Sequence, residues 1–220
     1  MSKSSYPMYI SVNGVGTSMV VPDAVRLLAS VSGLADSNKE ALANASNSAN
    51  AVRAALNKQA IASKDITTSS LIVYPEYRYS QEKGQQLIGY RAIQSFTIVL
   101  QAESAGAVID AVVDAGGESL QINGVSPFLA NGATATEKAR KAAVSDAKSK
   151  ANSYAKYLGT SIDKVIDLIE VSAPTYAFPT VAIPSKVELS DTTQIDLGNT
   201  EVTVNVKTRW SLKDIKSKSK

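Results

Sequence analysis

The sequence contains no cysteine and no histidine, and these two absences exclude much of the chemistry that proteins perform. Neither a Ser–His–Asp triad nor a Cys–His pair can form without them, and the usual zinc sites lose their ligands. A P-loop ending in Gly-Lys-Ser/Thr and an EF-hand calcium loop are also missing. We therefore predict a protein that is not an enzyme, with no catalytic residues, no metal ligands and no cofactor.

Long apolar runs and a strong charge imbalance are missing as well. No stretch approaches the roughly 20 apolar residues that cross a bilayer, and residues 1–9 lack the apolar core of a signal peptide. The net charge of +3 is too small to favour nucleic acid as a partner. The chain as given predicts no transmembrane segment. It predicts either a cytoplasmic protein or one whose signal peptide has been removed.

The basic C-terminal segment 213–220 ("KDIKSKSK") has two interpretations. The first is a solvated chain end, which is what short charged termini usually form. The second is a weak contact to an anionic surface, because clustered lysines are attracted to negative charge. The residue pattern favours the first and leaves the second open.

Hydrophobic residues make up 44% of the chain, which is enough for a full core. Two long segments carry alanine about every fourth residue, which predicts helices that lie close to whatever they cover. The expected helices cover residues 38–60, 105–117 and 137–159. The expected strands cover residues 8–13, 24–33, 65–79, 87–101, 118–130, 163–172 and 200–212.

This order predicts an α+β fold with a mostly antiparallel sheet, on one face of which the two long alanine-rich helices and the short helix pack. We expect a single domain over residues 8–213, with two sub-lobes as the open alternative. Residues 1–7 and 214–220 are expected to be flexible termini.

Helix-capping signals mark where the expected helices begin. Ser37 precedes Glu40 by three residues, and Thr134 precedes Glu137 by the same spacing, as in a capping box. Ser104 is placed to cap the short helix. We expect all three hydroxyl side chains to cap helix N-termini.

Glycine and proline mark the irregular positions. Gly14 and Gly16 follow the first expected strand and predict a bulge or tight turn with positive φ. A phosphate-binding loop at residues 14–19 is the weaker interpretation, because the third glycine and the following helix are missing. Pro75 cannot donate to a sheet ladder, so it predicts an edge strand or a bulge.

Four of the nine tyrosines lie within residues 74–90 of an expected hairpin. Tyr77 and Tyr79 share one face by the period of two, whereas Tyr74 and Arg78 share the other. Tyr90 is placed to pair across the strands with one of these tyrosines. The cluster is thus either a hairpin stiffened by aromatic pairs or a protein interface, where Tyr and Arg are enriched.

The segment 173–199 contains three prolines and has no helical period, so it predicts a long extended loop. Tyr176 and Phe178 make it the second candidate protein interface. The alternative is a mobile surface loop without a partner.

Five segments occur in an order that resembles the SIMPL domain family, also described as domain of unknown function 541. They are "ISVNGVGTSMVVPDAVRL" (10–27), "DITTSSLIVYPEYRY" (65–79), "GYRAIQSFTIVL" (89–100), "VIDAVVDAGGESLQINGVSPFL" (108–129) and "ARKAAVSDAKSKANSYAKYLG" (139–159). The resemblance covers residues 8–213. It implies a periplasmic, secreted or cell-surface bacterial protein that forms homo-oligomers, and it carries no catalytic residues over to this chain.

We therefore predict a non-enzymatic cell-envelope protein that acts by homo-oligomerisation or other protein contacts, with a role in envelope or oxidative stress protection. The candidate interface residues are Tyr74, Tyr77, Arg78, Tyr79, Tyr90, Tyr176 and Phe178. The alternative is a soluble cytoplasmic adaptor or a protein that binds a small ligand or metal ion.

Overall fold

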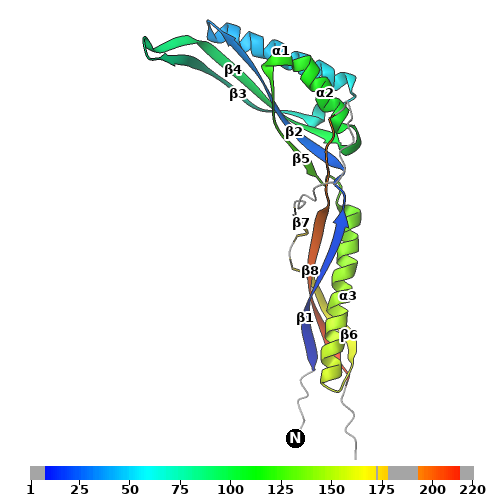
Figure 1. Ribbon diagram of the computed structural model, residues 1–220. Coiled ribbons are helices and arrows are strands. Elements are labelled where there is room, and N and C mark those ends of the chain that lie inside the picture. Colours follow the sequence, from blue (N-terminus) through cyan, green and yellow to red (C-terminus); the bar gives the residue numbers. More distant parts are fainter. Residues whose placement is uncertain (1–7, 172, 178–192, 214–220) are drawn as a thin grey trace, which may run out of the picture. The chain divides into compact units, whose positions relative to one another are not determined.

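Two antiparallel sheets, each covered by its own long helix, make up the described part of the chain (Figure 1). The computed structural model describes residues 8–171, 173–177 and 193–213. The chain divides into unit 1 (residues 1–21, 131–181 and 198–220) and unit 2 (residues 22–130 and 182–197). The predicted α+β class with antiparallel sheets is confirmed.

Unit 1 is a long helix on a sheet whose strands come from both ends of the chain. Its elements are β1 (Tyr9–Val20), α3 (Ala133–Tyr157), β6 (Ile162–Glu170), β7 (Thr175–Ala177) and β8 (Thr200–Leu212). The strand order is β1-β8-β6, and β7 pairs with the first part of β8. Strand β8 turns its even-numbered side chains, from Val202 to Trp210, toward the buried side.

Unit 2 contains the other four strands and two helices. Its elements are β2 (Ala24–Ala35), α1 (Asn38–Lys58), β3 (Ile66–Ser80), β4 (Gly84–Gln101), α2 (Ala105–Gly116) and β5 (Leu120–Phe128), with short 3-10 turns at Ser63–Asp65, Ala102–Ser104 and Gly117–Ser119. The strand order is β3-β4-β2-β5, so β3 and β5 are the edges.

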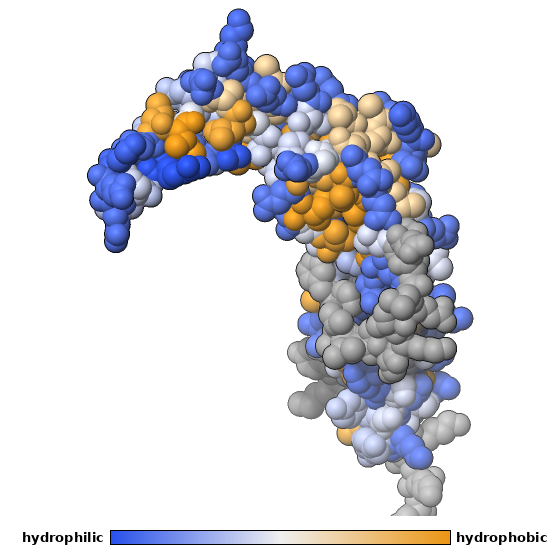
Figure 2. Space-filling view, turned by 45° about the horizontal axis from the view of Figure 1, so that its top comes forward, coloured by the Kyte–Doolittle hydropathy of each residue, from blue (hydrophilic) through white to orange (hydrophobic). Residues whose placement is uncertain are grey.

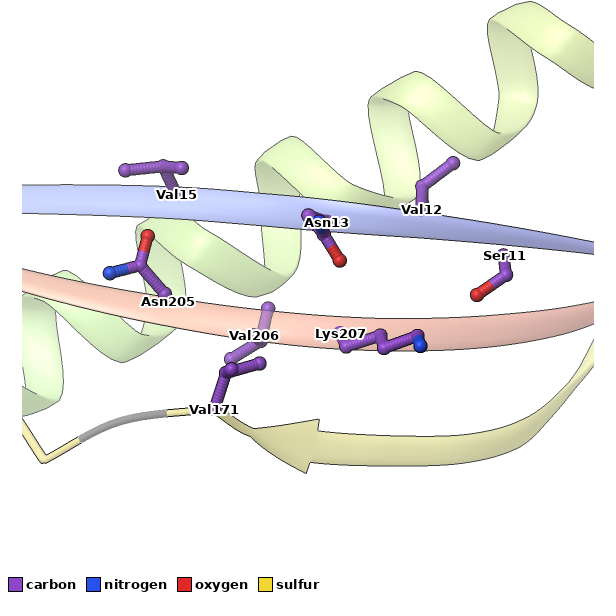
Figure 3. A pocket seen from close by; sticks show the side chains of 8 residues that line it. All are labelled: Ser11, Val12, Asn13, Val15, Val171, Asn205, Val206 and Lys207. Atoms are coloured by element: carbon purple, nitrogen blue, oxygen red, sulfur yellow. The ribbon is translucent and has the colours of Figure 1, made fainter.

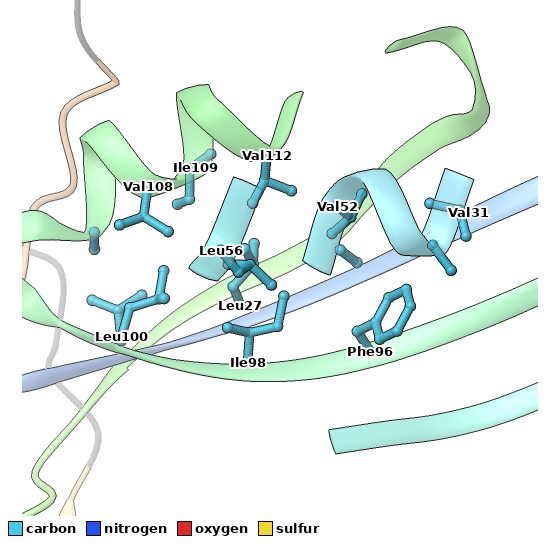
Figure 4. Close-up of a cluster of buried hydrophobic side chains, with 14 residues drawn as sticks. Leu27, Val31, Val52, Leu56, Phe96, Ile98, Leu100, Val108, Ile109 and Val112 are labelled. Carbon is cyan, nitrogen blue, oxygen red and sulfur yellow. The ribbon is translucent and has the colours of Figure 1, made fainter. Parts of the chain in front are cut away.

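The core of unit 2 lies between the sheet and both of its helices (Figure 4). Branched and aromatic side chains supply it, as expected for strands that are buried on one face. The largest buried members are Val25, Leu27, Val31, Val52, Leu56, Phe96, Ile98, Leu100, Val108 and Val112. The guanidinium of Arg53 lies 5.0 Å from the ring centre of Phe96, so part of the core is covered by a cation–π contact.

The expectation that both long helices cover one sheet is wrong. Helix α1 contacts β2 and β4, whereas α3 contacts β1 and β8 of the other sheet. The reason is the pairing of β1 with β8, which joins segments from opposite ends of the sequence. Local periodicity carries no information about such long-range pairs.

The prediction of irregular backbone at Gly14 and Gly16 is also wrong. Strand β1 runs without a break through both glycines, and neither has a positive φ. A Cβ on Gly14 would come within 2.7 Å of the Cβ of Ala147, and a Cβ on Gly16 would overlap the backbone of Ala139 and Ala143. These glycines therefore let the alanine face of α3 approach the strand closely.

The same arrangement recurs in unit 2, between α1 and β2. A Cβ on Gly33 would lie 2.6 Å from the carbonyl oxygen of Ala41 and 2.6 Å from the amide nitrogen of Ala45. Both alanines are fully buried. In each unit, a strand glycine opposite a helix alanine sets the spacing between the two layers.

The capping predictions have mixed outcomes. The Ser37 side chain accepts a hydrogen bond from the Glu40 amide (3.3 Å) and donates one to its carboxylate (3.0 Å), which confirms that capping box. Thr134 does not cap, because α3 already begins at Ala133, after Gly132. Ser104 does not cap either, since its hydroxyl donates to the carbonyl of Gln101.

Candidate protein interface

Strands β3 and β4 form a hairpin arm whose outer strand, β3, is an edge of the unit 2 sheet (Figure 1). The edge position predicted for Pro75 is confirmed. Residues 67–75 are all exposed. Within the described residues β3 pairs with β4 alone, so its outer backbone groups face no other strand.

The exposed part of β3 contains an uncharged apolar run, Leu71, Ile72, Val73 and Tyr74, which we call the β3 edge run. Exposed fractions of its side chains range from 39% to 52%. The run lies in regular register between two shifts, at Thr68/Ser70 and at Glu76/Tyr77. Figure 2 shows hydrophobic residues on the arm behind a hydrophilic hairpin tip.

A double hydrogen-bonded ion pair crosses the arm next to this run. The guanidinium of Arg91 donates to both carboxylate oxygens of Glu76, with an Nη2–Oε1 distance of 2.9 Å, and its Nη1 lies 3.4 Å from the hydroxyl of Ser32. The hydrogen bond from Arg91 lowers the pKa of the Glu76 carboxyl below its usual value, although desolvation acts in the opposite direction. The pair therefore joins β3, β4 and β2 at one level of the sheet.

The tyrosines predicted for the interface separate into different environments. Tyr77, Arg78 and Tyr79 are exposed near the end of the arm, and Tyr79 is 76% exposed. Tyr90 is half-buried and packs on a small cluster around Ala41. The predicted cross-strand tyrosine pair is wrong, because Tyr90 lies opposite Pro75.

The second predicted surface belongs to unit 1. Tyr176 lies on β7 with 48% of its side chain exposed, and its hydroxyl lies 3.5 Å from that of Thr136. Phe178 lies outside the described residues. Strand β7 shows that part of the expected loop 173–199 is extended and paired with β8.

The β1 edge of unit 1 contrasts with β3, because side chains of α3 bond two of its outer backbone groups. The carboxylate of Asp146 accepts a hydrogen bond from the Val15 amide (2.8 Å), and the ammonium of Lys150 donates to the carbonyl of Asn13 (3.2 Å). Asp146 and Lys150 also pair with each other at 2.6 Å. Such occupied edge groups oppose strand addition.

Strand β6, the other edge of unit 1, is protected differently. It carries exposed apolar residues, but Asp163, Lys164 and Asp167 interrupt them, and its register with β8 shifts twice. Charges and bulges are common devices against edge-to-edge pairing. Among these three edges, the β3 edge run is the longest apolar stretch without a charge. Its sequence alone did not indicate that these side chains are exposed rather than buried.

A depression of about 670 Å³ lies on the open face of the unit 1 sheet (Figure 3). Its polar lining consists of Ser11, Asn13, Asn205 and Lys207, with Val15 and Val171 beside them. These groups can hydrogen-bond a ligand, but Lys207 is the one titratable side chain among them and no carboxylate lines the depression. The part of the chain that the structure describes holds no group of three or more metal-ligating side chains.

Within the described residues, no helix combines the length and hydropathy needed to cross a membrane.

Comparison with known proteins gives a family match over most of the chain. The model of the SIMPL family, described as "Protein of unknown function (DUF541)", matches residues 10–210. The 26 kDa periplasmic immunogenic proteins of Brucella melitensis and Brucella abortus are each 28% identical over 182 residues, covering 80% of this chain and 72% of theirs. The uncharacterized protein YggE of Edwardsiella ictaluri is 30% identical over 111 residues, covering 50% of this chain and 46% of its own.

Among solved structures, a hydrolase from Listeria innocua aligns over 90% of this chain and 92% of its own. Its sequence identity is 13% and its TM-score is 0.16. At that TM-score the alignment carries no argument about fold or activity.

Proposed function

The chain belongs to the SIMPL family, and from this premise we propose that it is a non-enzymatic cell-envelope protein that associates with further copies of itself through the β3 edge run. The observation that carries the proposal is the contrast between the edges. Strand β1 has two of its outer backbone groups, the Val15 amide and the Asn13 carbonyl, bonded by Asp146 and Lys150, whereas β3 presents an uncharged apolar run. An exposed apolar edge strand is a template for pairing with another chain.

The envelope location is supported by the relatives named periplasmic, which share 28% of their residues with this chain over the aligned part. Fractionation of the source cells, with detection by antibody, tests this part of the proposal. Recovery with periplasmic or surface markers supports it, and recovery only with cytoplasmic markers favours the adaptor alternative.

A role in protecting the envelope against oxidative stress rests on the family resemblance alone. Its test compares the survival of deletion and complemented strains under peroxide. Equal survival contradicts this role without affecting the proposed self-association.

Self-association is tested by the mass in solution, using light scattering coupled to size exclusion. We expect a discrete multiple of 23.2 kDa for the native chain. The variant Leu71→Lys/Val73→Lys places two charges on the edge, so we expect it to shift the mass toward the monomer, because charged side chains oppose edge pairing.

The matched control is Met19→Lys, which introduces a charge at an exposed apolar position, 61% exposed, on the partly occupied β1 edge. It is expected to keep the native mass. A native monomer, or an unchanged mass for the β3 variant, would overturn the proposed interface.

A further inference from the structure

One end of unit 1 gathers the starts or ends of four elements, which come from the beginning, the middle and the end of the sequence. Helix α3 ends there, β1 and β6 begin there, and β8 ends there (Figure 1). The Leu212 amide donates to the carbonyl of Met8 (3.0 Å), and the Lys213 amide donates to the carbonyl of Ser161 (2.9 Å). The Thr160 hydroxyl donates to the carbonyl of Lys213 (2.6 Å). We call this end the α3 tip.

Large apolar and aromatic side chains are exposed at the α3 tip. Tyr157 is 79% exposed, Leu158 is 59% exposed, and Tyr154 and Tyr9 are each 54% exposed. The rings of Tyr154 and Tyr157 meet edge to face at 6.4 Å. Tyr154, Tyr157 and Leu158 lie off the buried alanine stripe of α3, which ends at Ala155, whereas the ring of Tyr9 lies 4.9 Å from the guanidinium of Arg209.

Helical spacing places part of this cluster on one flank of α3. Tyr154 and Leu158 follow Lys150 by four and eight residues, and residues four apart lie on the same helix face. Lys150 reaches the carbonyl of Asn13 on β1, so that flank overhangs the β1 edge. Tyr154 and Leu158 therefore lie on the side of α3 that faces β1.

The charges at the α3 tip are mainly positive. Lys156, Lys164 and Lys213 form no ion pair with the described residues, whereas Asp167 is within 3.6 Å of Arg209. The second carboxylate near the start of β6 belongs to Asp163.

We propose that the α3 tip binds the surface of an anionic lipid bilayer. Tyrosine rings favour the boundary between headgroups and acyl chains, where one end of the side chain is apolar and the other hydrated. Unpaired lysines beside them are attracted to negatively charged headgroups. Apolar side chains combined with excess positive charge match this surface better than a neutral protein groove, and binding here is separate from the β3 edge run.

The test is co-sedimentation of the full chain with vesicles. One set contains phosphatidylcholine alone, and the other contains equal parts phosphatidylcholine and phosphatidylglycerol. We expect binding to the anionic vesicles, little binding to the neutral ones, and a strong decrease between about 50 mM and about 500 mM salt, because added ions screen the lysines. Absence of binding to anionic vesicles at low salt would overturn the proposal.

Two variants separate the apolar and the electrostatic parts. Tyr157→Ser/Leu158→Ser is expected to weaken binding about tenfold through lost apolar contact. Lys156→Gln/Lys213→Gln is expected to weaken it about fivefold for each lysine removed. The matched control, Tyr77→Ser/Tyr79→Ser on the arm, is expected to bind like the native chain.

Equal binding by the tip variants and the native chain would contradict the assignment. A change of solution mass in the Tyr157/Leu158 variant without lipid would also overturn it, because the tip would then be a contact between protein copies. Circular dichroism checks that each variant keeps its fold. All these positions are exposed, so the folded structure is expected to persist.

Discussion

At the residue scale, the distance between helix and sheet depends on glycines that have ordinary strand conformations. Gly14 and Gly16 lie beneath the alanine stripe of α3, and Gly33 lies beneath that of α1. An added methyl group would meet helix backbone rather than a flexible side chain, so the overlap cannot be relieved by a rotamer change. The absence of a side chain at these three positions therefore allows the close contact between helix and sheet in both units.

Gly16→Ala tests this point. We expect it to lower the free energy of unfolding by about 3 kcal/mol, since overpacking against a rigid neighbour is destabilising. Urea denaturation followed by circular dichroism measures the change. The matched control is Gly124→Ala, whose Cβ would meet only Leu28 Cδ1, at 3.8 Å, and whose effect is expected to stay within about 0.5 kcal/mol. Equal stability of both variants would contradict the close-approach explanation.

At the scale of elements, the four-residue spacing of Asp146 and Lys150 lets α3 bond two outer backbone groups of β1, the Val15 amide and the Asn13 carbonyl. Strand β3 has no such neighbour on its outer side within the described residues. The two sheets thus have the same close packing of a helix on a strand. They differ in whether side chains of the helix bond the backbone groups of an edge strand. This difference identifies the surface on which the proposed self-association depends.

The Asp146 contact predicts a pH dependence of stability. The hydrogen bond from Lys150, followed by that from the Val15 amide, lowers the pKa of Asp146 despite some desolvation. A carboxylate with a lowered folded-state pKa stabilises the fold above its ordinary pKa of about 3.9. That stabilisation is lost as the pH falls through the lowered value.

Asp146→Asn is therefore expected to reduce stability near neutral pH by about 0.5–1 kcal/mol, a small value because Lys150 is exposed and Asp146 is partly exposed. The difference from the native chain should vanish in strong acid. Urea titrations across this range measure it, with the exposed Asp163→Asn as matched control. A difference that persists unchanged at the lowest pH would show that the carboxylate charge is not responsible.

At the scale of the whole molecule, each unit has its own sheet and its own helix-covered face. The described residues place the large aromatic and branched core of unit 2 between its sheet, α1 and α2. In unit 1 the buried face consists mainly of alanines and valines, together with Ile10, Thr208 and Trp210. A substitution that destabilises the core of one unit is therefore expected to lower the stability mainly of that unit.

Phe96→Ala tests this expectation. The side chain is 1% exposed, and its removal is expected to cost about 3–5 kcal/mol through lost burial and a cavity. Hydrogen exchange should show faster exchange throughout unit 2 and little change in α3 and β8. Val113→Ala on α2, 44% exposed, is the control and should leave both units unchanged. Equal acceleration in both units would show that they unfold together.

The sequence by itself determined the features that depend on neighbouring residues. Periodicity located the helices and most strands, and the Ser37–Glu40 spacing correctly predicted a capping box. The missing cysteine and histidine excluded whole classes of chemistry without any structure. The ordered segments also indicated the family that the family model matches.

Only the tertiary structure decided which strands pair and which strands lie at the sheet edges. The run Leu71–Tyr74 has the composition of a buried strand, and its exposure follows from the edge position of β3. At the register shift between Glu76 and Tyr77, β4 has one more residue than β3, and this places Tyr90 opposite Pro75. The pairing of β1 with β8 forms a second sheet, so each long helix covers its own sheet. These outcomes depend on contacts between distant segments, whereas local periodicity reports only which side of a helix or strand is apolar.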